Sequence, residues 1–182
     1  MKSILLAIAF VLTTTGILCN IPGPRPATPD FRAITAEQIK EGYKQEVKDR
    51  VFNRAAAQAQ DVFRAHHVVL RHATLVAKYA LAHHIPVRLL AAVVYAESTG
   101  NASAISAHGD VGLMQINMKV WKYSRTELLN PERNLQIGSH ILGALIHQYG
   151  TVEGLHHYNG MGRQDNSYAA HVFQVAGYKV PA

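Results

Sequence analysis

Residues 87–96 constrain the fold of this chain more than any other stretch. Within them, only Arg88 and the hydroxyl group of Tyr95 are polar. Pro86 precedes the stretch, and proline is well tolerated in the first turn of a helix. A helix that is apolar on all sides has to be surrounded by the rest of the protein. We therefore expect a central helix that ends at residues 99–101, Thr-Gly-Asn.

One carboxylate, Glu97, stands at the end of this apolar helix. The alternative is an ordinary surface carboxylate, but the C-terminal end of a helix repels negative charge. Burial raises the pKa of a carboxyl group, so that it keeps a proton that it can donate near neutral pH. The pattern predicts Glu97 as an acid catalyst at the entrance to a polar loop.

The remaining chain is typical of a mainly α fold with at most a small β element. Apolar residues recur at helical spacing, and no sustained alternation predicts strands. Thr35 and Gln38 form a predicted capping box, and Asn130 precedes a helix that begins at Pro131. We expect a short strand or turn within residues 113–120. The predicted helical regions are residues 35–84, with separate segments at 55–63 and 68–83, then 131–149, 152–157 and 167–175.

The N-terminal end has the layout of an export signal. Lys2 precedes an apolar run at residues 4–12, and small residues follow it. Residues 1–19 are therefore interpreted as a signal peptide or an N-terminal anchor, with lipidation of Cys19 as an alternative. The proline-rich residues 20–34 are interpreted as a linker. We expect an exported protein of the periplasm or cell envelope, which contacts a membrane through this segment when it is uncleaved or lipidated.

The formal charge of +6 suits an anionic polymer such as nucleic acid, an acidic membrane surface or bacterial cell wall. No run of Lys and Arg and no aromatic-basic platform supports nucleic acid, so we do not expect that partner. The eleven histidines contain no H-E-x-x-H pattern, and Cys19 is the lone cysteine. We therefore expect neither a metal nor another cofactor.

A second set of residues extends the pattern that begins at Glu97. In chain order it comprises Glu97-Ser98, the segment SAHGDVGLMQ at residues 106–115, Asn130-Pro131, Asn134, Gly138, Tyr158-Asn159-Gly160 and Tyr168. This ordered set resembles the catalytic domain of the soluble lytic transglycosylases, the SLT domain, over roughly residues 86–175. The resemblance implies a lysozyme-like helical domain at residues 85–182, preceded by an N-terminal helical region at residues 35–84, that cleaves peptidoglycan.

The resemblance also implies roles for individual residues. Glu97 would be the acid/base that cleaves the MurNAc–GlcNAc bond and leaves a 1,6-anhydro-muramoyl product. Ser106 and Gln115 match positions that contact the sugar. Tyr158 and Asn159 match a pair that lines the cleft, and Tyr168 matches a tyrosine that orients the catalytic glutamate. Amide and hydroxyl groups suit neutral sugars because they form hydrogen bonds without adding charge.

Two positions leave alternatives open. Asn117 stands where the common SLT pattern has methionine, so a hydrogen-bonding side chain would face the sugar. Residues 110–117 are also similar to a segment of chicken-type lysozymes in which the aspartate is a second carboxylate. Because of Asp110, a hydrolytic muramidase that uses this second carboxylate stays an alternative function.

The same blend of segments is similar to small transglycosylases associated with secretion and conjugation systems. Residues 35–83, which none of these motifs includes, support a third reading. In that reading the chain is a structural or binding module of a secretion, conjugation or phage apparatus.

Overall fold

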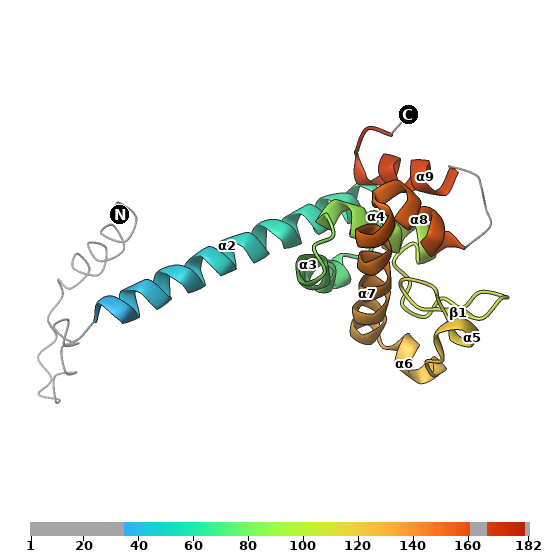
Figure 1. The fold of residues 1–182 in the computed structure, drawn as a ribbon, viewed down its shortest axis with the longest axis horizontal. Helices are drawn as coiled ribbons and strands as arrows, with labels where there is room; N and C mark the ends of the chain where they lie inside the picture. Colours follow the sequence, from blue (N-terminus) through green and yellow to red (C-terminus); the bar gives the residue numbers. More distant parts are fainter. Residues whose placement is uncertain (1–34, 161–166, 181–182) are drawn as a thin grey trace, which may run out of the picture. The chain divides into compact units, whose positions relative to one another are not determined.

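The computed structural model describes residues 35–160 and 167–180 (Figure 1). The predicted signal or anchor at residues 1–19 and the linker at 20–34 lie outside the described residues. The described chain is mainly helical with one small sheet, which confirms the predicted fold class. Its elements are α2 (Ala36–Ala65), η2 (Leu70–His72), α3 (Ala73–Ala82), α4 (Val87–Ser98), β1 (Asp110–Val111), β2 (Ile116–Asn117), α5 (Met118–Trp121), α6 (Arg125–Leu129), α7 (Pro131–Tyr149), α8 (Thr151–Asn159) and α9 (Ser167–Ala176).

Helix α4 is the predicted central helix. Its residues from Leu89 to Val94 are all buried, and it packs against α3 and α9 (Figure 1). It ends at Thr99, whose φ of 52° is left-handed, and Gly100 follows with φ 77°. A Cβ atom at Gly100 would lie 2.3 Å from Cγ1 of Val68. The helix therefore ends where predicted, because glycine alone fits both the backbone angle and the close contact.

The small sheet is a hairpin in which β1 and β2 run antiparallel, with Asp110 opposite Asn117. The turn between them is held by the buried side chain of Asn134 on α7. Its Oδ1 accepts a hydrogen bond from the amide of Met114 at 2.8 Å. Its Nδ2 donates to the carbonyl oxygen atoms of Val111 at 2.8 Å and Leu128 at 2.9 Å. One buried amide thus joins the hairpin, α6 and α7.

Helix α7 begins and ends as predicted. The Oδ1 atom of Asn130 accepts a hydrogen bond from the amide of Arg133 at 3.0 Å, and Gly150 ends the helix with φ 83°. One face of α7 packs against α3, α6 and α8. Of the six apolar residues predicted for this face, the first four are buried and the last two are half-buried: Leu135, Ile137, Ile141, Leu142, Leu145 and Ile146.

The N-terminal helical region comprises α2, η2 and α3. Thr35 and Gln38 exchange backbone-to-side-chain hydrogen bonds of 2.8 and 3.2 Å, which confirms the capping box. The predicted segment 55–63 is the buried end of α2, and the segment 68–83 comprises η2 and α3. Helix α3 packs on α4 and α7, so the packing around α4 continues N-terminal to residue 85. No helix in the described ranges meets the length and apolarity needed to cross a membrane.

Candidate functional site

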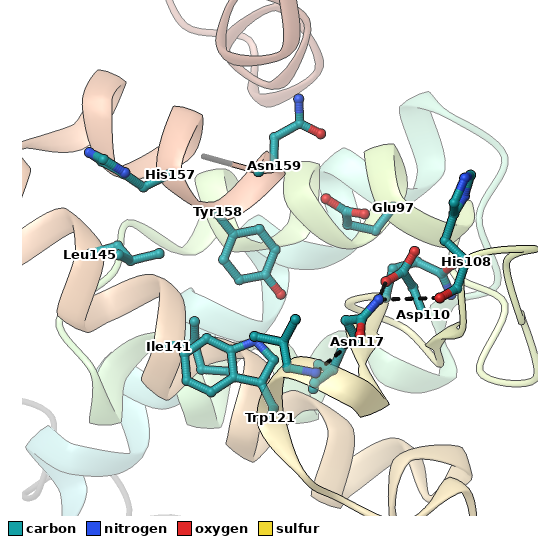
Figure 2. A pocket seen from close by; sticks show the side chains of 14 residues that line it. Glu97, His108, Asp110, Asn117, Trp121, Ile141, Leu145, His157, Tyr158 and Asn159 are labelled. Carbon is teal, nitrogen blue, oxygen red and sulfur yellow. Dashed lines mark hydrogen bonds between the residues drawn. The ribbon is translucent and has the colours of Figure 1, made fainter. Parts of the chain in front are cut away.

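A cleft of about 620 Å³ lies beside the end of α4 (Figure 2). Its walls come from α4, the hairpin, α5, α7 and α8, so segments far apart in the sequence meet there. Several predicted site residues line it: Glu97, Asp110, Gln115, Asn117, Tyr158 and Asn159.

Glu97 is the strongly perturbed acid of this cleft. Burial raises the pKa of its carboxyl group from 4.5 to about 7, the hydrogen bond from Tyr168 lowers this pKa, and the charge of Asp110 raises it. The next residue, Ser98, is buried and donates hydrogen bonds to the carbonyl oxygen atoms of Val94 at 3.2 Å and Leu113 at 2.9 Å. Ser98 thereby anchors the last turn of α4 to the hairpin and positions the carboxyl group beside it.

Tyr168 approaches Glu97 from α9. Its hydroxyl group donates a hydrogen bond of 2.5 Å to Oε1 of Glu97. Burial and the neighbouring Glu97 hold the pKa of Tyr168 well above its usual value, so the phenol remains a donor. This hydrogen bond connects the glutamate and the tyrosine that the family resemblance pairs.

Tyr158 and Asn159 stand at the end of α8, on the cleft wall facing the hairpin (Figure 2). The hydroxyl group of Tyr158 donates a 2.8 Å hydrogen bond to the carbonyl oxygen of Met114. Burial raises the pKa of Tyr158 well above its usual value. Tyr158 therefore ties α8 to the hairpin turn while its ring lines the cleft.

Asp110 lies in a hydrogen-bond network with two other predicted site residues. Its Oδ2 atom accepts a 2.7 Å bond from Oγ of Ser106, and its Oδ1 atom accepts a 2.7 Å bond from Nδ2 of Asn117. The Oδ1 atom of Asn117 also caps α5 by accepting from the amides of Lys119 and Val120. Ser106 is not among the cleft-lining residues, and its hydroxyl group serves Asp110.

Gln115 reaches the cleft through an unusual backbone conformation. Its φ is 45°, in the left-handed region, at the end of the hairpin turn. The Nε2 atom donates hydrogen bonds to the carbonyl oxygen atoms of Ala104 at 3.2 Å and Gly112 at 2.9 Å. These bonds hold the side chain of Gln115 across the loop, and the residue forms part of the cleft wall.

Sequence reasoning did not assign a site role to seven other residues that line the cleft: His108, Ile116, Val120, Trp121, Ile141, Leu145 and Gly160. Trp121, the lone tryptophan, is 46% exposed, and an exposed aromatic ring in a cleft is a recognisable signal. His157 also lines the cleft, and its ring lies 4.1 Å from that of Tyr149. Within residues 35–160 and 167–180, no group of three or more His, Cys, Asp or Glu could hold a metal ion.

Comparison with known proteins gives consistent matches. The model of the transglycosylase SLT domain family matches residues 74–179. Over 80 residues the chain is 39% identical to the endo-type membrane-bound lytic murein transglycosylase A of Cronobacter sakazakii. It is 36% identical to the proteins of the same name from an Enterobacter species and Citrobacter koseri. Each match covers 37% of this chain, and the chain spans 38% of the length of each relative.

Proposed function

Because the chain belongs to the transglycosylase SLT domain family, we propose that it is a peptidoglycan lytic transglycosylase. It would cleave the β-1,4 bond between MurNAc and GlcNAc and form a 1,6-anhydro-muramoyl end. The observation that carries this proposal is Glu97, a half-buried acid with a pKa of about 7 beside a cleft large enough for sugar rings.

The first step uses Glu97 as an acid. Its carboxyl group donates a proton to the glycosidic oxygen, the bond from that oxygen to C1 of MurNAc breaks, and GlcNAc leaves as the free hydroxyl. A group with a pKa near 7 suits this work because it is still partly protonated at neutral pH and readily gives up its proton.

The second step uses the same residue as a base. The Glu97 carboxylate takes the proton of the MurNAc C6 hydroxyl group while that oxygen bonds to C1 and closes the anhydro ring. Glu97 is then protonated again, and no water enters the balance. The Tyr168 hydroxyl group stabilises the carboxylate formed between the two steps through its hydrogen bond.

The remaining cleft residues would hold the glycan. Gln115 and Asn159 bring neutral amide groups to the cleft wall, which suits the hydroxyl and acetamido groups of the sugars. Asn117 would act on the sugar through Asp110, since its amide is bonded to that carboxylate and to the first turn of α5. Ser106 would act on the sugar through Asp110, since its hydroxyl group is bonded to that carboxylate.

Digestion of purified peptidoglycan sacculi, followed by mass spectrometry of the muropeptides, tests this function. We expect anhydro ends with the full chain and no product with Glu97→Gln. The matched control Glu37→Gln, at an exposed carboxylate in the first turn of α2, should remain active. Reducing ends in place of anhydro ends would contradict the proposal.

A second candidate is a muramidase that uses Asp110 as a second carboxylate. It is favoured by one observation, the presence of Asp110 and Glu97 on the walls of the same cleft. The network with Ser106 and Asn117 opposes it, because both carboxylate oxygens already accept hydrogen bonds. The muropeptide experiment separates the two, since hydrolysis leaves reducing ends.

The location and partners are also part of the proposal. A substrate in the cell wall would require a location in the cell envelope, and the relatives are described as membrane-bound. Export through residues 1–19 and association with a secretion or conjugation apparatus rest on the sequence.

A further inference from the structure

Residues 40–54 of α2 extend beyond the hydrophobic core. None of them is buried, and the buried residues of this helix begin at Ala55. An isolated helical segment of this size is marginally stable in water, and Gly42 weakens it further. The segment therefore lacks the packing that usually stabilises a helix.

Three apolar side chains, which we call the α2 ridge, form a line along this exposed segment. Tyr43, Val47 and Val51 are spaced four residues apart and are 61%, 40% and 50% exposed. Side chains four residues apart are neighbours on a helix surface. The same line continues toward the core, where its next members are buried: Ala55, Ala59 and Phe63. The ridge thus prolongs a packing surface beyond the part that the domain covers.

Positive side chains border the α2 ridge on both sides. The residues three positions before and three positions after each ridge member are its other surface neighbours. The preceding ones are Lys40, Lys44 and Lys48, and the following ones are Glu46, Arg50 and Arg54. Five of the six are cations, of which Arg50 is paired with Glu46 at 2.5 Å and Lys44 is paired with Glu41, and both pairs are exposed. The ridge is therefore an apolar line in a basic border.

We propose that the α2 ridge docks a partner polypeptide that presents apolar side chains bordered by Asp and Glu. Apolar contact would cover Tyr43, Val47 and Val51, and the partner's carboxylates would pair with the bordering cations. Such complementarity gives a docking surface its specificity and its association rate.

A second copy of this chain fits the ridge poorly. In a symmetric antiparallel pair centred on Val47, Lys40 would face Arg54 and Lys44 would face Arg50, and like charges in such positions repel. A bilayer also fits poorly, because interfacial helices bury a broad apolar face. The α2 ridge is one residue wide, with charged side chains at both edges.

Two synthetic helical peptides test the proposal. Both are about 20 residues long, long enough to form helix, and carry one apolar stripe. Glu borders the stripe in one peptide and Lys borders it in the other. Fluorescence anisotropy with the full chain should show the Glu peptide binding at least about tenfold more tightly. Raising the salt concentration should weaken this binding.

Variants of the chain locate the binding surface. Combined Lys40→Glu, Lys44→Glu and Lys48→Glu should reverse the preference toward the Lys peptide. Combined Tyr43→Ser, Val47→Ser and Val51→Ser should abolish binding of both. The matched control, Gln45→Ser with Asn53→Ser, changes exposed positions away from the ridge and should bind like the unchanged chain. Peptidoglycan cleavage and far-ultraviolet circular dichroism should be unchanged in all three.

Four results would overturn the proposal. They are equal binding of the two peptides, binding that survives the serine substitutions, light scattering that shows dimers lost with those substitutions, and ridge-dependent binding to phosphatidylglycerol vesicles. The third would assign the ridge to a second copy and the fourth to an anionic membrane.

Discussion

At the scale of single residues, the proposed chemistry depends on two opposing effects on the pKa of Glu97. Burial disfavours its carboxylate, and the hydrogen bond from Tyr168 favours it. A carboxyl group held between these influences is able to release a proton in one step and to recover one in the next. Tyr168 is a positioning residue in the proposed mechanism, since it would act through its hydrogen bond to Glu97.

Replacing Tyr168 by Phe should change the pH profile as well as the rate. The proposed proton donor is protonated Glu97, so kcat/KM should fall as pH rises through about 7. Loss of the hydrogen bond raises the pKa of Glu97, which moves this fall to higher pH. Loss of positioning should lower kcat about tenfold. The control is Tyr95→Phe, which changes another half-buried tyrosine, two positions before Glu97 in the sequence. This variant should leave the pH profile unchanged. A Tyr168→Phe profile that is not shifted would contradict the positioning role.

Replacing Asp110 by Asn separates the two candidate reactions. In a lytic transglycosylase the side chain organises the loop through Ser106 and Asn117, and the amide retains an oxygen that accepts hydrogen bonds. We expect cleavage to remain within about tenfold of the unchanged protein, with anhydro ends as the product. Kinetics on sacculi with muropeptide analysis measure both. Complete loss of activity would instead favour Asp110 as a second carboxylate.

At the scale of elements, the cleft depends on how α7 holds the hairpin. Asn134 bonds to three backbone groups, and Gly138, one turn further along α7, lies against Met114. Gly112 faces the same amide, since a Cβ atom there would lie 2.3 Å from Nδ2 of Asn134. Asn134, Gly138 and Gly112 belong to the family motif but do not line the cleft. By holding the hairpin, they position Gln115 and Asp110 on the cleft wall.

Gly138→Ala should destabilise the domain even though alanine favours helix. The added Cβ atom would lie 2.6 Å from Sδ and 2.8 Å from Cβ of Met114, both in the buried core. We expect a loss of about 1–3 kcal/mol in the free energy of unfolding, measured by chemical denaturation. Gly42→Ala is the matched control, because it also lies within a helix but meets no atom within 4 Å. Equal stability of the two variants would show that the hairpin tolerates the added methyl group.

At the scale of the whole molecule, the burial of the Glu97 carboxyl group has a cost in stability. Its pKa is 4.5 in the reference state and about 7 in the folded protein, so the folded state holds the proton more tightly. The resulting stabilisation is complete below pH 4.5 and is lost as pH rises through 7. The full effect is up to about 3 kcal/mol.

Glu97→Gln should therefore stabilise the protein more at high pH than at low pH. Glutamine resembles the protonated acid and does not ionise. The difference in unfolding free energy between the variant and the unchanged chain should grow from about pH 5 to about pH 8. Because the histidines are the same in both proteins, their titration cancels in the difference. A difference independent of pH would mean that Glu97 ionises as easily in the folded state as in the unfolded chain.

Much of the fold is predictable from the sequence because its signals are local. The caps at Thr35 and Asn130 and the stop at Gly150 depend on neighbouring residues, and each was confirmed. Helices α5 and α6 were not predicted as helices, because they are short and have little room for a helical period. The capping box of Ser124 and Glu127 was the local signal for α6.

The sequence by itself determined the helical class, the family motifs and the choice of Glu97, since each depends on residue order. Tertiary structure decided the chemistry around that residue. Tyr168 lies 71 positions away and reaches Glu97 only when α9 packs on α4. Burial, which raises the pKa of Glu97, likewise depends on elements distant in the chain. The bonding of Ser106 and Asn117 to Asp110 required the paired strands, because hydrogen bonds depend on distance and direction in space.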